Sequence, residues 1–259
     1  MTVTLALLYH DPEGRLIDLV NRTLPVIADI FDGIANNASP QANPQALELW
    51  RSAGALVEIE SRGEGLPIYR LGAARRAAAT LALQHGVDYV MYCDGDRIVH
   101  WATNYPDELR RVVAQIPGHD FTVLGRTRRA FDSHPGVQRD TEGIVNQVFA
   151  RVTGQAWDVG GAARGLSRRA VAAINEHCPD DTICVDVTWP LCLRKLGEFS
   201  FNDLMVEGLE FETGDGYGHQ RVEPQDYTRW LKSLDDDPRR WSHRLNIAHM
   251  MVEKIIEYT

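Results

Sequence analysis

The stretch Asp88-Tyr-Val-Met-Tyr-Cys-Asp94-Gly-Asp96-Arg97 has the pattern of a buried strand that runs directly into two carboxylates. Its first part is a short apolar run with β-branched and aromatic residues, which is typical of such a strand. Side chains at i and i+2 of an extended segment point the same way, and Gly95 leaves room for a ligand between them. Two carboxylates so close together repel each other unless a cation or a hydrogen-bond network lies between them. The pattern therefore predicts a site for a hard divalent cation held by oxygens.

The composition is that of an ordinary soluble chain. Its 259 residues suffice for one large domain, or one domain with a small appendage, and 44% hydrophobic residues can fill the core. A net charge of −9 argues against a protein that binds nucleic acid in bulk. The apolar run 3–9 lacks a basic leader, and no segment has the length of a membrane span, so we expect a cytoplasmic protein. The four cysteines lack the paired spacing of a zinc site, and we expect reduced, mostly buried thiols.

Apolar and amphipathic runs alternate through the first half of the chain. The expected strands cover residues 2–9, 33–37, 55–60 and 89–93, and the expected helices cover 15–31, 44–53 and 69–85. This alternation is typical of a parallel α/β sheet, whose ligand crevice lies beyond the carboxyl ends of the strands. We therefore expect one rim to gather four strand ends, at Tyr9, Asn37, Glu60 and Cys93.

The second half of the chain is less regular. We expect helices over residues 105–116, 141–153, 167–176 and 187–196, and strands over 120–126, 199–204 and 208–212. Between them lie a basic loop at 126–136 and a glycine-rich segment at 158–165. The tail 224–259 is predicted to be helical with a break near 235–238, and its tryptophan and methionine content suggests a homodimer.

Several segments, in this order, resemble the GT-A nucleotide-sugar glycosyltransferases. They are Ile34-Ala-Asn-Asn-Ala-Ser39, Gly72-Ala-Ala-Arg75-Arg76-Ala-Ala-Ala and Tyr92-Cys-Asp94-Gly-Asp96, which carries a DxD motif. The segment Gly160-Gly161…Leu166-Ser-Arg-Arg169-Ala is similar to the acceptor side of family-2-like enzymes, and Asp215-Gly-Tyr-Gly-His219 resembles the distal metal histidine of the mannosylglycerate and glucosylglycerate synthase branch. The resemblance implies a GT-A three-layer α/β sandwich with a mixed central sheet over residues 1–222, followed by a C-terminal helical extension at 223–259.

The resemblance also implies roles for the acidic residues of the DxD motif. Asp96 would bind Mn²⁺ or Mg²⁺, which neutralises charge on the departing nucleoside diphosphate, and Asp94 would hold the ribose or a sugar hydroxyl. His219 would complete the metal shell, and an imidazole ligand suits Mn²⁺ better than Mg²⁺. The alternative for His219 is a surface histidine in a glycine-rich loop.

Other residues near the rim are candidates for holding the donor. Asn37 stands where many relatives carry an aspartate that contacts the base or ribose, and its amide can hydrogen-bond a base. Tyr9 and His10 could hold the base or simply begin a loop, and Glu60 lies on the same rim. Arg75, near the start of a helix whose N-terminus favours anions, would reach the diphosphate or the donor sugar. Alternatively, Asn37 is an ordinary turn residue.

Asp186 is the acidic candidate on the acceptor side. It precedes a predicted helix, where inverting relatives place a general base, but an aspartate at that position could equally cap the helix. Retaining members of the synthase branch lack a clear base, so the stereochemical outcome stays open. Gly160 and Gly161 are the acceptor-side glycines that the resemblance implies.

A basic loop supplies candidates for an acidic acceptor. Arg126 and Arg128, together with Arg129 and His134, would clamp an anion such as a glycerate-like group. The alternative is that this loop is only exposed to solvent.

The predicted function is transfer of a hexose from a UDP- or GDP-linked donor to a small hydroxyl acceptor, which could be acidic. Two alternatives from other classes stay open. One is a haloacid-dehalogenase-like phosphatase that uses Asp94 as its nucleophile, since such enzymes also need a strand followed by Asp-x-Asp. The other is a non-catalytic nucleotide-sugar-binding module. A nucleotidyltransferase is disfavoured, because no glycine-rich, lysine-containing loop follows the first strand.

Overall fold

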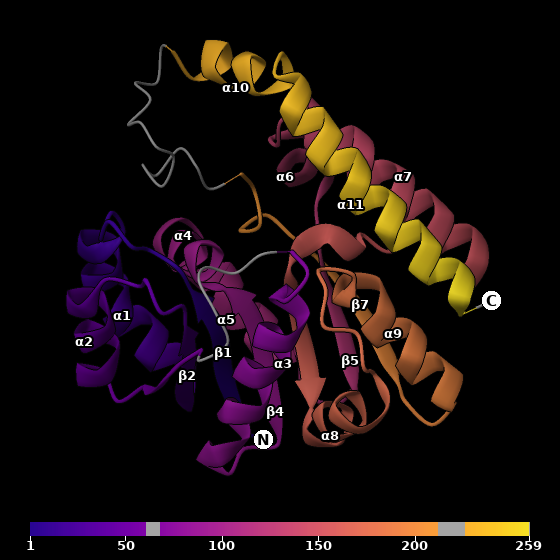
Figure 1. Cartoon of the computed structure of the whole chain (residues 1–259). Helices are drawn as coiled ribbons and strands as arrows, with labels where there is room; N and C mark the ends of the chain where they lie inside the picture. Colours follow the sequence, from indigo (N-terminus) through magenta and orange to yellow (C-terminus); the bar gives the residue numbers. More distant parts are fainter. Residues whose placement is uncertain (61–67, 212–225, 259) are drawn as a thin grey trace.

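The computed structural model describes residues 1–60, 68–211 and 226–258 of the chain. Its centre is a seven-stranded sheet with the strand order β3-β2-β1-β4-β6-β5-β7 (Figure 1). The strands are β1 (Val3–Tyr9), β2 (Gly33–Ala38), β3 (Leu56–Ile59), β4 (Tyr89–Asp94), β5 (Phe121–Arg126), β6 (Ala163–Ser167) and β7 (Phe201–Val206). The α-helices of the first half are α1 (Ile17–Ile30), α2 (Pro44–Ser52), α3 (Leu71–Ala82), α4 (Gly95–Asn104) and α5 (Pro106–Gln115). Those of the second half are α6 (Arg128–Asp132), α7 (Gly136–Thr153), α8 (Arg168–His177), α9 (Val185–Leu196), α10 (Tyr227–Asp235) and α11 (Pro238–Glu257).

The sheet is mixed, as the resemblance implied. Strands β1 to β4 pair in parallel, and so do β5 and β7, whereas β6 is antiparallel to both of its neighbours. The parallel pairing predicted for the first half is confirmed, whereas the residues of β6 were expected to belong to a glycine-rich segment leading to a helix. Gly165 explains how a strand fits there, because a Cβ atom at this position would lie 3.0 Å from Ile116 and 3.1 Å from Thr122.

The strand register brings all four expected strand ends to one edge of the sheet. Leu8 of β1 is paired with Asn37 of β2 on one side and with Asp94 of β4 on the other. Asn37 is in turn opposite Glu58 of β3. Since parallel strands in register end together, the carboxyl ends of these strands form a common rim.

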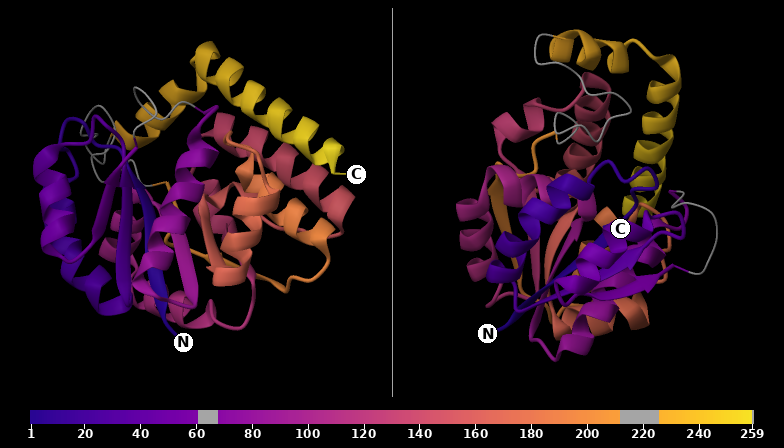
Figure 2. Two further views of the ribbon diagram at one scale, coloured as in Figure 1. Left: turned by 60° about the horizontal axis from the view of Figure 1, so that its bottom comes forward. Right: turned by 90° about the vertical axis from the view of Figure 1, so that its left-hand side faces the viewer.

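Helices cover both faces of the sheet, which makes three layers (Figure 2). Alternate residues of β1 enter different cores, since Leu5 and Leu7 pack beneath α1, α2, α4 and α5, while Ala6 and Leu8 pack beneath α3. The second core continues under α7, α8, α9 and α11. The sheet is therefore buried on both faces, and its rim is the edge left for a ligand.

The C-terminal extension ends in a long helix that is part of the structure's core. Helix α11 lies along α7 and also packs on α9 (Figure 1). Ile247, Met251 and Ile255 at helical spacing are buried in the same cluster as the sheet residues. Asp237, whose side chain accepts a hydrogen bond from Arg239 N, caps the start of this helix within the predicted break at 235–238.

Three local expectations were wrong. The predicted basic loop contains a short helix, α6, because the Thr127 hydroxyl caps its N-terminus. The described part of the predicted strand 208–212, residues 208–211, forms a turn after β7. Two cysteines are not reduced, since Cys178 at the end of α8 and Cys192 on α9 form a disulfide across helices that pack together. Cys93 and Cys184 are free and buried, as expected. Within the described ranges, no helix has the length and apolar character needed to cross a membrane.

Candidate functional site

Strand β4 delivers Asp94 to the rim, and helix α4 begins at the next residue. Gly95 is required at this junction, since a Cβ atom there would lie 2.5 Å from the carbonyl oxygen of Leu8. Asp96 lies in the first turn of α4, where the helix dipole favours a negative charge. The two carboxylates were expected to be alternate residues of an extended segment. Instead, Asp94 ends a strand and Asp96 lies in the first turn of a helix.

Arg75 joins Asp94 to Asp186, residues that are far apart in the sequence. Its guanidinium donates from Nη2 to Asp94 Oδ2 at 3.0 Å and from Nη1 to Asp186 Oδ1 at 2.9 Å. Its Nε donates to the Tyr92 hydroxyl at 3.1 Å, and that hydroxyl donates to Asp94. Burial alone would lower the pKa of Arg75, but the charges of Asp186 and Asp94 outweigh it and hold the pKa well above its usual range. A permanently charged, buried cation thus fixes both carboxylates.

Asp186 has a second arginine partner, Arg164, which no sequence motif singles out. Asp186 is the second residue of α9, so the expectation that it could cap that helix was wrong, and Cys184 is the N-cap instead. Arg164 on β6 approaches Asp186 Oδ1 at 3.4 Å and donates to the carbonyl oxygens of Val159 and Ala163. Burial lowers the pKa of Arg164, and the charge of Asp186 partly offsets this effect. A fully buried arginine needs a partner for its charge. For an arginine in a strand of small residues such as β6, that partner can be identified only once the fold is known.

Two cavities meet at Asp94. One, of about 240 Å³, is lined by residues of the β1 and β4 ends and of the first turn of α4, among them His10 and Asp96. We call it the β1–β4 cavity. The other, of about 190 Å³, lies between α3, α7, α9 and α11 and is lined by Asp186 and Gly160. We call it the α7–α11 cavity. Asp94 and Leu71 line both, so the two cavities share a boundary beside the Arg75 bridge.

The residues predicted to hold the donor are divided between two places. Tyr9 and His10 line the β1–β4 cavity with both DxD carboxylates, although the Tyr9 ring is buried against Trp50 and its hydroxyl donates to Asp11 at 3.1 Å. Asn37 and Glu60 line a different cavity, of about 370 Å³, on the far side of α3.

Asn37 and Glu60, the two predicted donor residues that line this other cavity, both lie where strands of the sheet end. Asn37 belongs to β2, is buried, and donates from Nδ2 to the carbonyl oxygen of Ala74 at 3.0 Å. The expectation that it is a turn residue was therefore wrong, because β2 extends through it. The backbone N–H of Glu60 donates to the Ala38 carbonyl at 2.8 Å, which places Glu60 at the end of β3.

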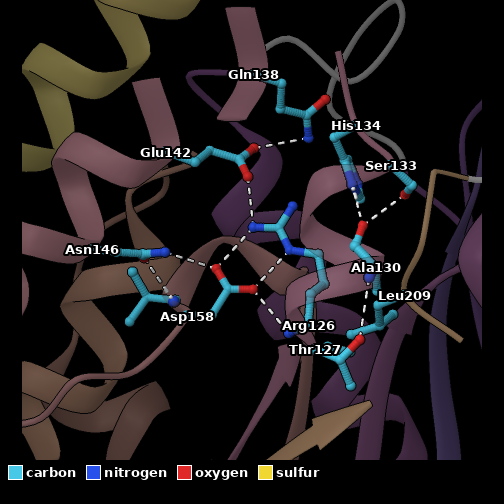
Figure 3. Close-up of polar contacts among 12 residues, drawn as sticks. Arg126, Thr127, Ala130, Ser133, His134, Gln138, Glu142, Asn146, Asp158 and Leu209 are labelled. Carbon is cyan, nitrogen blue, oxygen red and sulfur yellow. Dashed lines mark hydrogen bonds and ion pairs between the residues drawn. The ribbon is translucent and has the colours of Figure 1, made fainter. Parts of the chain in front are cut away.

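The predicted anion clamp is not assembled. Arg126 is fully buried behind the α7–α11 cavity, where it donates to Asp158 from Nε at 2.7 Å and from Nη2 at 2.8 Å (Figure 3). Its Nη2 also pairs with Glu142 Oε2 at 2.7 Å. Arg128, by contrast, has an 89% exposed side chain and pairs with Asp132. The predicted clamp fails for two reasons. Successive residues of helix α6 point in different directions, so its arginines do not converge, and two carboxylates already neutralise Arg126.

The other members of the predicted clamp are also engaged elsewhere. Arg129 pairs with Glu207 and with Glu210, each at 2.5 Å. His134 is buried, and burial followed by the charges of Arg126 and Arg97 lowers its pKa to about 2. A neutral imidazole cannot neutralise an anion. Of the predicted acceptor residues, Gly160 lines the α7–α11 cavity, and Gly161 packs against the Leu124 carbonyl at the start of β6.

The residues at the β1–β4 cavity suit a hard cation. Asp96 is partly exposed there beside Asp94, and carboxylate oxygens are the ligands that Mg²⁺ and Mn²⁺ accept. His219, the predicted third ligand, lies outside the described residues. Within residues 1–60, 68–211 and 226–258, no three His, Cys, Asp or Glu side chains are grouped closely enough to enclose a metal. A metal here would therefore complete its shell with other ligands.

No family model matches the chain, and no curated protein matches it in sequence. Solved structures do match. Glucosyl-3-phosphoglycerate synthase from Mycobacterium tuberculosis, in complex with phosphoglyceric acid, aligns with a TM-score of 0.53 over 99% of this chain and 79% of that chain, at 12% identity. The fold is the GT-A fold. The complex of that synthase with Mn²⁺, UDP and glucosyl-3-phosphoglycerate gives a TM-score of 0.52 with the same coverage and 11% identity.

A further mycobacterial protein aligns with a TM-score of 0.51 and 14% identity over 79% of this chain and 65% of its own. The expected GT-A architecture, and its likeness to the glucosylglycerate synthase branch, are thus confirmed as a fold. The sequences differ at nearly nine positions in ten, so the likeness shows the fold and no residue role.

Proposed function

We propose that this chain is a glycosyltransferase that moves a hexose from a nucleoside-diphosphate-sugar to a small hydroxyl acceptor. The observation that carries the proposal is the Arg75 bridge between Asp94 and Asp186, set where two cavities meet. A transferase has to bring two substrates together at one reacting centre, and adjoining cavities that share the carboxylate of Asp94 suit that need. The GT-A fold supports the same reading, since neighbours with this fold bind UDP-glucose and phosphoglyceric acid together with Mn²⁺.

The donor diphosphate would occupy the β1–β4 cavity. Asp96, at the start of α4, would hold a divalent cation, Mn²⁺ or Mg²⁺, with His219 as a further candidate ligand. When bound, such a cation neutralises charge on the leaving nucleoside diphosphate. Asp94 would accept hydrogen bonds from the ribose or sugar hydroxyls, since Arg75 and Tyr92 already fix its orientation. The base, uracil or guanine, would lie toward His10, whose ring contacts Ser39 at 2.7 Å.

The acceptor would occupy the α7–α11 cavity with its hydroxyl toward Asp186. Arg75 and Arg164 hold the carboxylate of Asp186 in one orientation at the floor of that cavity. A carboxylate so placed can orient the acceptor hydroxyl by accepting its hydrogen bond. Gly160 contributes backbone rather than a side chain to the lining, which lets a substrate approach the main chain closely.

Thermal denaturation with nucleotides tests the proposal. UDP or GDP should raise the melting temperature in the presence of Mn²⁺ or Mg²⁺ and have little effect without a cation, because the metal bridges nucleotide and protein. Asp96→Asn should abolish the metal-dependent shift. Asp107→Asn is a matched control, since Asp107 is an exposed aspartate in the first turn of α5. The proposal fails if neither nucleotide shifts the transition with either metal.

The phosphatase alternative is less compatible with the site. Its nucleophile would be Asp94, yet both carboxylate oxygens of Asp94 are already hydrogen-bonded, to Arg75 and to Tyr92. A nucleophile needs a carboxylate oxygen directed at the substrate. Hydrolysis of a generic phosphate ester that is lost in Asp94→Asn would support the phosphatase instead. A non-catalytic module would bind UDP or GDP without releasing sugar from any donor.

A further inference from the structure

The α7–α11 cavity has one apolar side. Ile247, Ala248 and Met251, successive inward residues of α11, form part of its wall, and Val145 of α7 lies beside them. Ile183 adds to the apolar surface, and Leu71 extends it to the boundary with the β1–β4 cavity. A ligand that fills this space must therefore bury some carbon surface against α11.

The polar side of the same cavity carries balanced charge. Three guanidinium groups line it, those of Arg75, Arg97 and Arg244. Three carboxylates line it as well, those of Asp94, Glu142 and Asp186. Gln138, Thr141 and Asn146 complete the polar lining with uncharged groups. Among residues 1–60, 68–211 and 226–258, the lining thus contributes no net positive charge, in spite of its arginines.

The arginines at the floor are neutralised by direct contacts. Arg75 lies between Asp94 and Asp186, and Arg164 behind it also contacts Asp186. This first set therefore contains two guanidinium groups and two carboxylates. A bound anion would have to compete with those carboxylates for the same donors.

The second set shows the same balance. Arg126 pairs with Asp158 and Glu142 (Figure 3), and Arg244 donates to Glu142 Oε1 at 3.2 Å. Arg97, the remaining cation of the lining, donates from Nη1 to the Leu209 carbonyl at 3.3 Å. An incoming carboxylate or phosphate would lie close to three existing carboxylates and would have to displace them from Arg75 and Arg244 while losing its own hydration.

We infer that the α7–α11 cavity takes an uncharged hydroxyl compound with an apolar portion, such as an alcohol, a polyol ether or an ester, rather than an acid or a phosphate. This inference rests on the proposed function, because it names the class of acceptor for the same site. It separates the chain from the structural neighbours, one of which is solved with phosphoglyceric acid. Repulsion between the lining carboxylates and an anionic acceptor would give this site its selectivity.

Calorimetric binding of a matched series tests the inference without any donor or turnover. The series is D-glycerate, 3-phosphoglycerate, methyl D-glycerate and butyl D-glycerate. We expect the methyl ester to bind at least 10-fold more tightly than glycerate, and the butyl ester more tightly still. Binding of glycerate or 3-phosphoglycerate at least as tight as that of the methyl ester overturns the inference. So does the absence of ester binding at tens of millimolar.

Changes in the charge balance sharpen the test. Glu142→Gln removes one lining carboxylate and should shift the preference at least 10-fold toward glycerate. If that variant fails to fold because Arg126 loses a partner, Met251→Lys adds a cation from α11 and should shift the preference in the same direction. Asp132→Asn, which changes an exposed carboxylate paired with Arg128, is the matched control. An unchanged preference in the folded charge variants overturns the electrostatic reasoning.

The two proposals fail in different ways. Transfer of sugar to glycerate in preference to its ester would sustain the glycosyltransferase and overturn the neutral acceptor. Tight, selective ester binding in a protein that shows no nucleotide-dependent shift would support the neutral cavity and overturn the transferase.

Discussion

Replacement of Arg75 by methionine is the most direct test of the site's architecture. The side chain of Arg75 is 4% exposed, and its guanidinium lies 2.9 Å from Asp186 and 3.0 Å from Asp94. The side chain of Asp186 is 10% exposed and that of Asp94 is 25% exposed. Arg75→Met keeps much of the volume but leaves Asp94 without its arginine partner and Asp186 with Arg164 alone, at 3.4 Å. Breaking a buried ion pair from one side costs about 3–5 kcal/mol. For a chain of this size, that loss lowers the melting temperature by roughly 6–20 °C.

Urea unfolding followed by circular dichroism measures this cost. Arg76→Met is the matched control, since Arg76 is the next residue of α3 but pairs with Asp181, whose side chain is 54% exposed. That pair should contribute at most about 1 kcal/mol. The double variant Arg75→Met/Asp94→Asn removes the carboxylate that has lost its arginine and should be more stable than Arg75→Met alone. A loss in Arg75→Met no greater than in Arg76→Met, or a double variant less stable than the single one, would refute the bridge.

Three further predictions concern the fold and its pH dependence. Because the pKa of His134 is lowered to about 2 in the folded protein, the unfolded chain takes up a proton below about pH 6.5 that the folded chain refuses. Stability should therefore fall by about 1.4 kcal/mol for each pH unit below 6.5, and urea titrations of His134→Phe should lack this component. Gly95→Ala should cost about 1–3 kcal/mol, because its Cβ would clash with the Leu8 carbonyl, and calorimetry of unfolding would detect the loss. Denatured protein alkylated without a reductant should carry two labels by mass spectrometry, on Cys93 and Cys184, and four after reduction; four labels without reductant would show that the Cys178–Cys192 disulfide is absent.

The parts of the fold that the sequence predicted are those with local signals. The strand that ends at Asp94 and the helix that contains Arg75 were predicted because apolar runs and an alanine-rich segment mark them without reference to the rest of the chain. Their common rim followed from the rule that parallel strands end together. The antiparallel strand β6 was missed, since Ala163–Ser167 contains an arginine and a glycine and gives no alternating pattern.

The residues of the candidate site were predicted from the sequence, but the contacts between them were not. Arg75, Asp94 and Asp186 were named separately, and only the fold shows that the first contacts the other two. Arg126 was misjudged because a loop arginine and a buried arginine look alike in sequence, and its partners Asp158 and Glu142 come from distant segments. Pairings between residues many positions apart depend on tertiary packing, which no local pattern encodes.

The boundary shared by the two cavities has a thermodynamic consequence. Asp94 lines both, and Arg75 transmits any change at Asp94 to Asp186 on the other side. A ligand that alters the hydrogen bonds of Asp94 in the β1–β4 cavity must alter the free energy of occupying the α7–α11 cavity as well. Such coupling is reciprocal, so the factor by which one ligand changes the affinity of the second equals the factor by which the second changes that of the first. Binding on the two sides of Arg75 is then cooperative or anticooperative rather than independent, and a single pair of titrations, each with and without the other ligand, gives its sign.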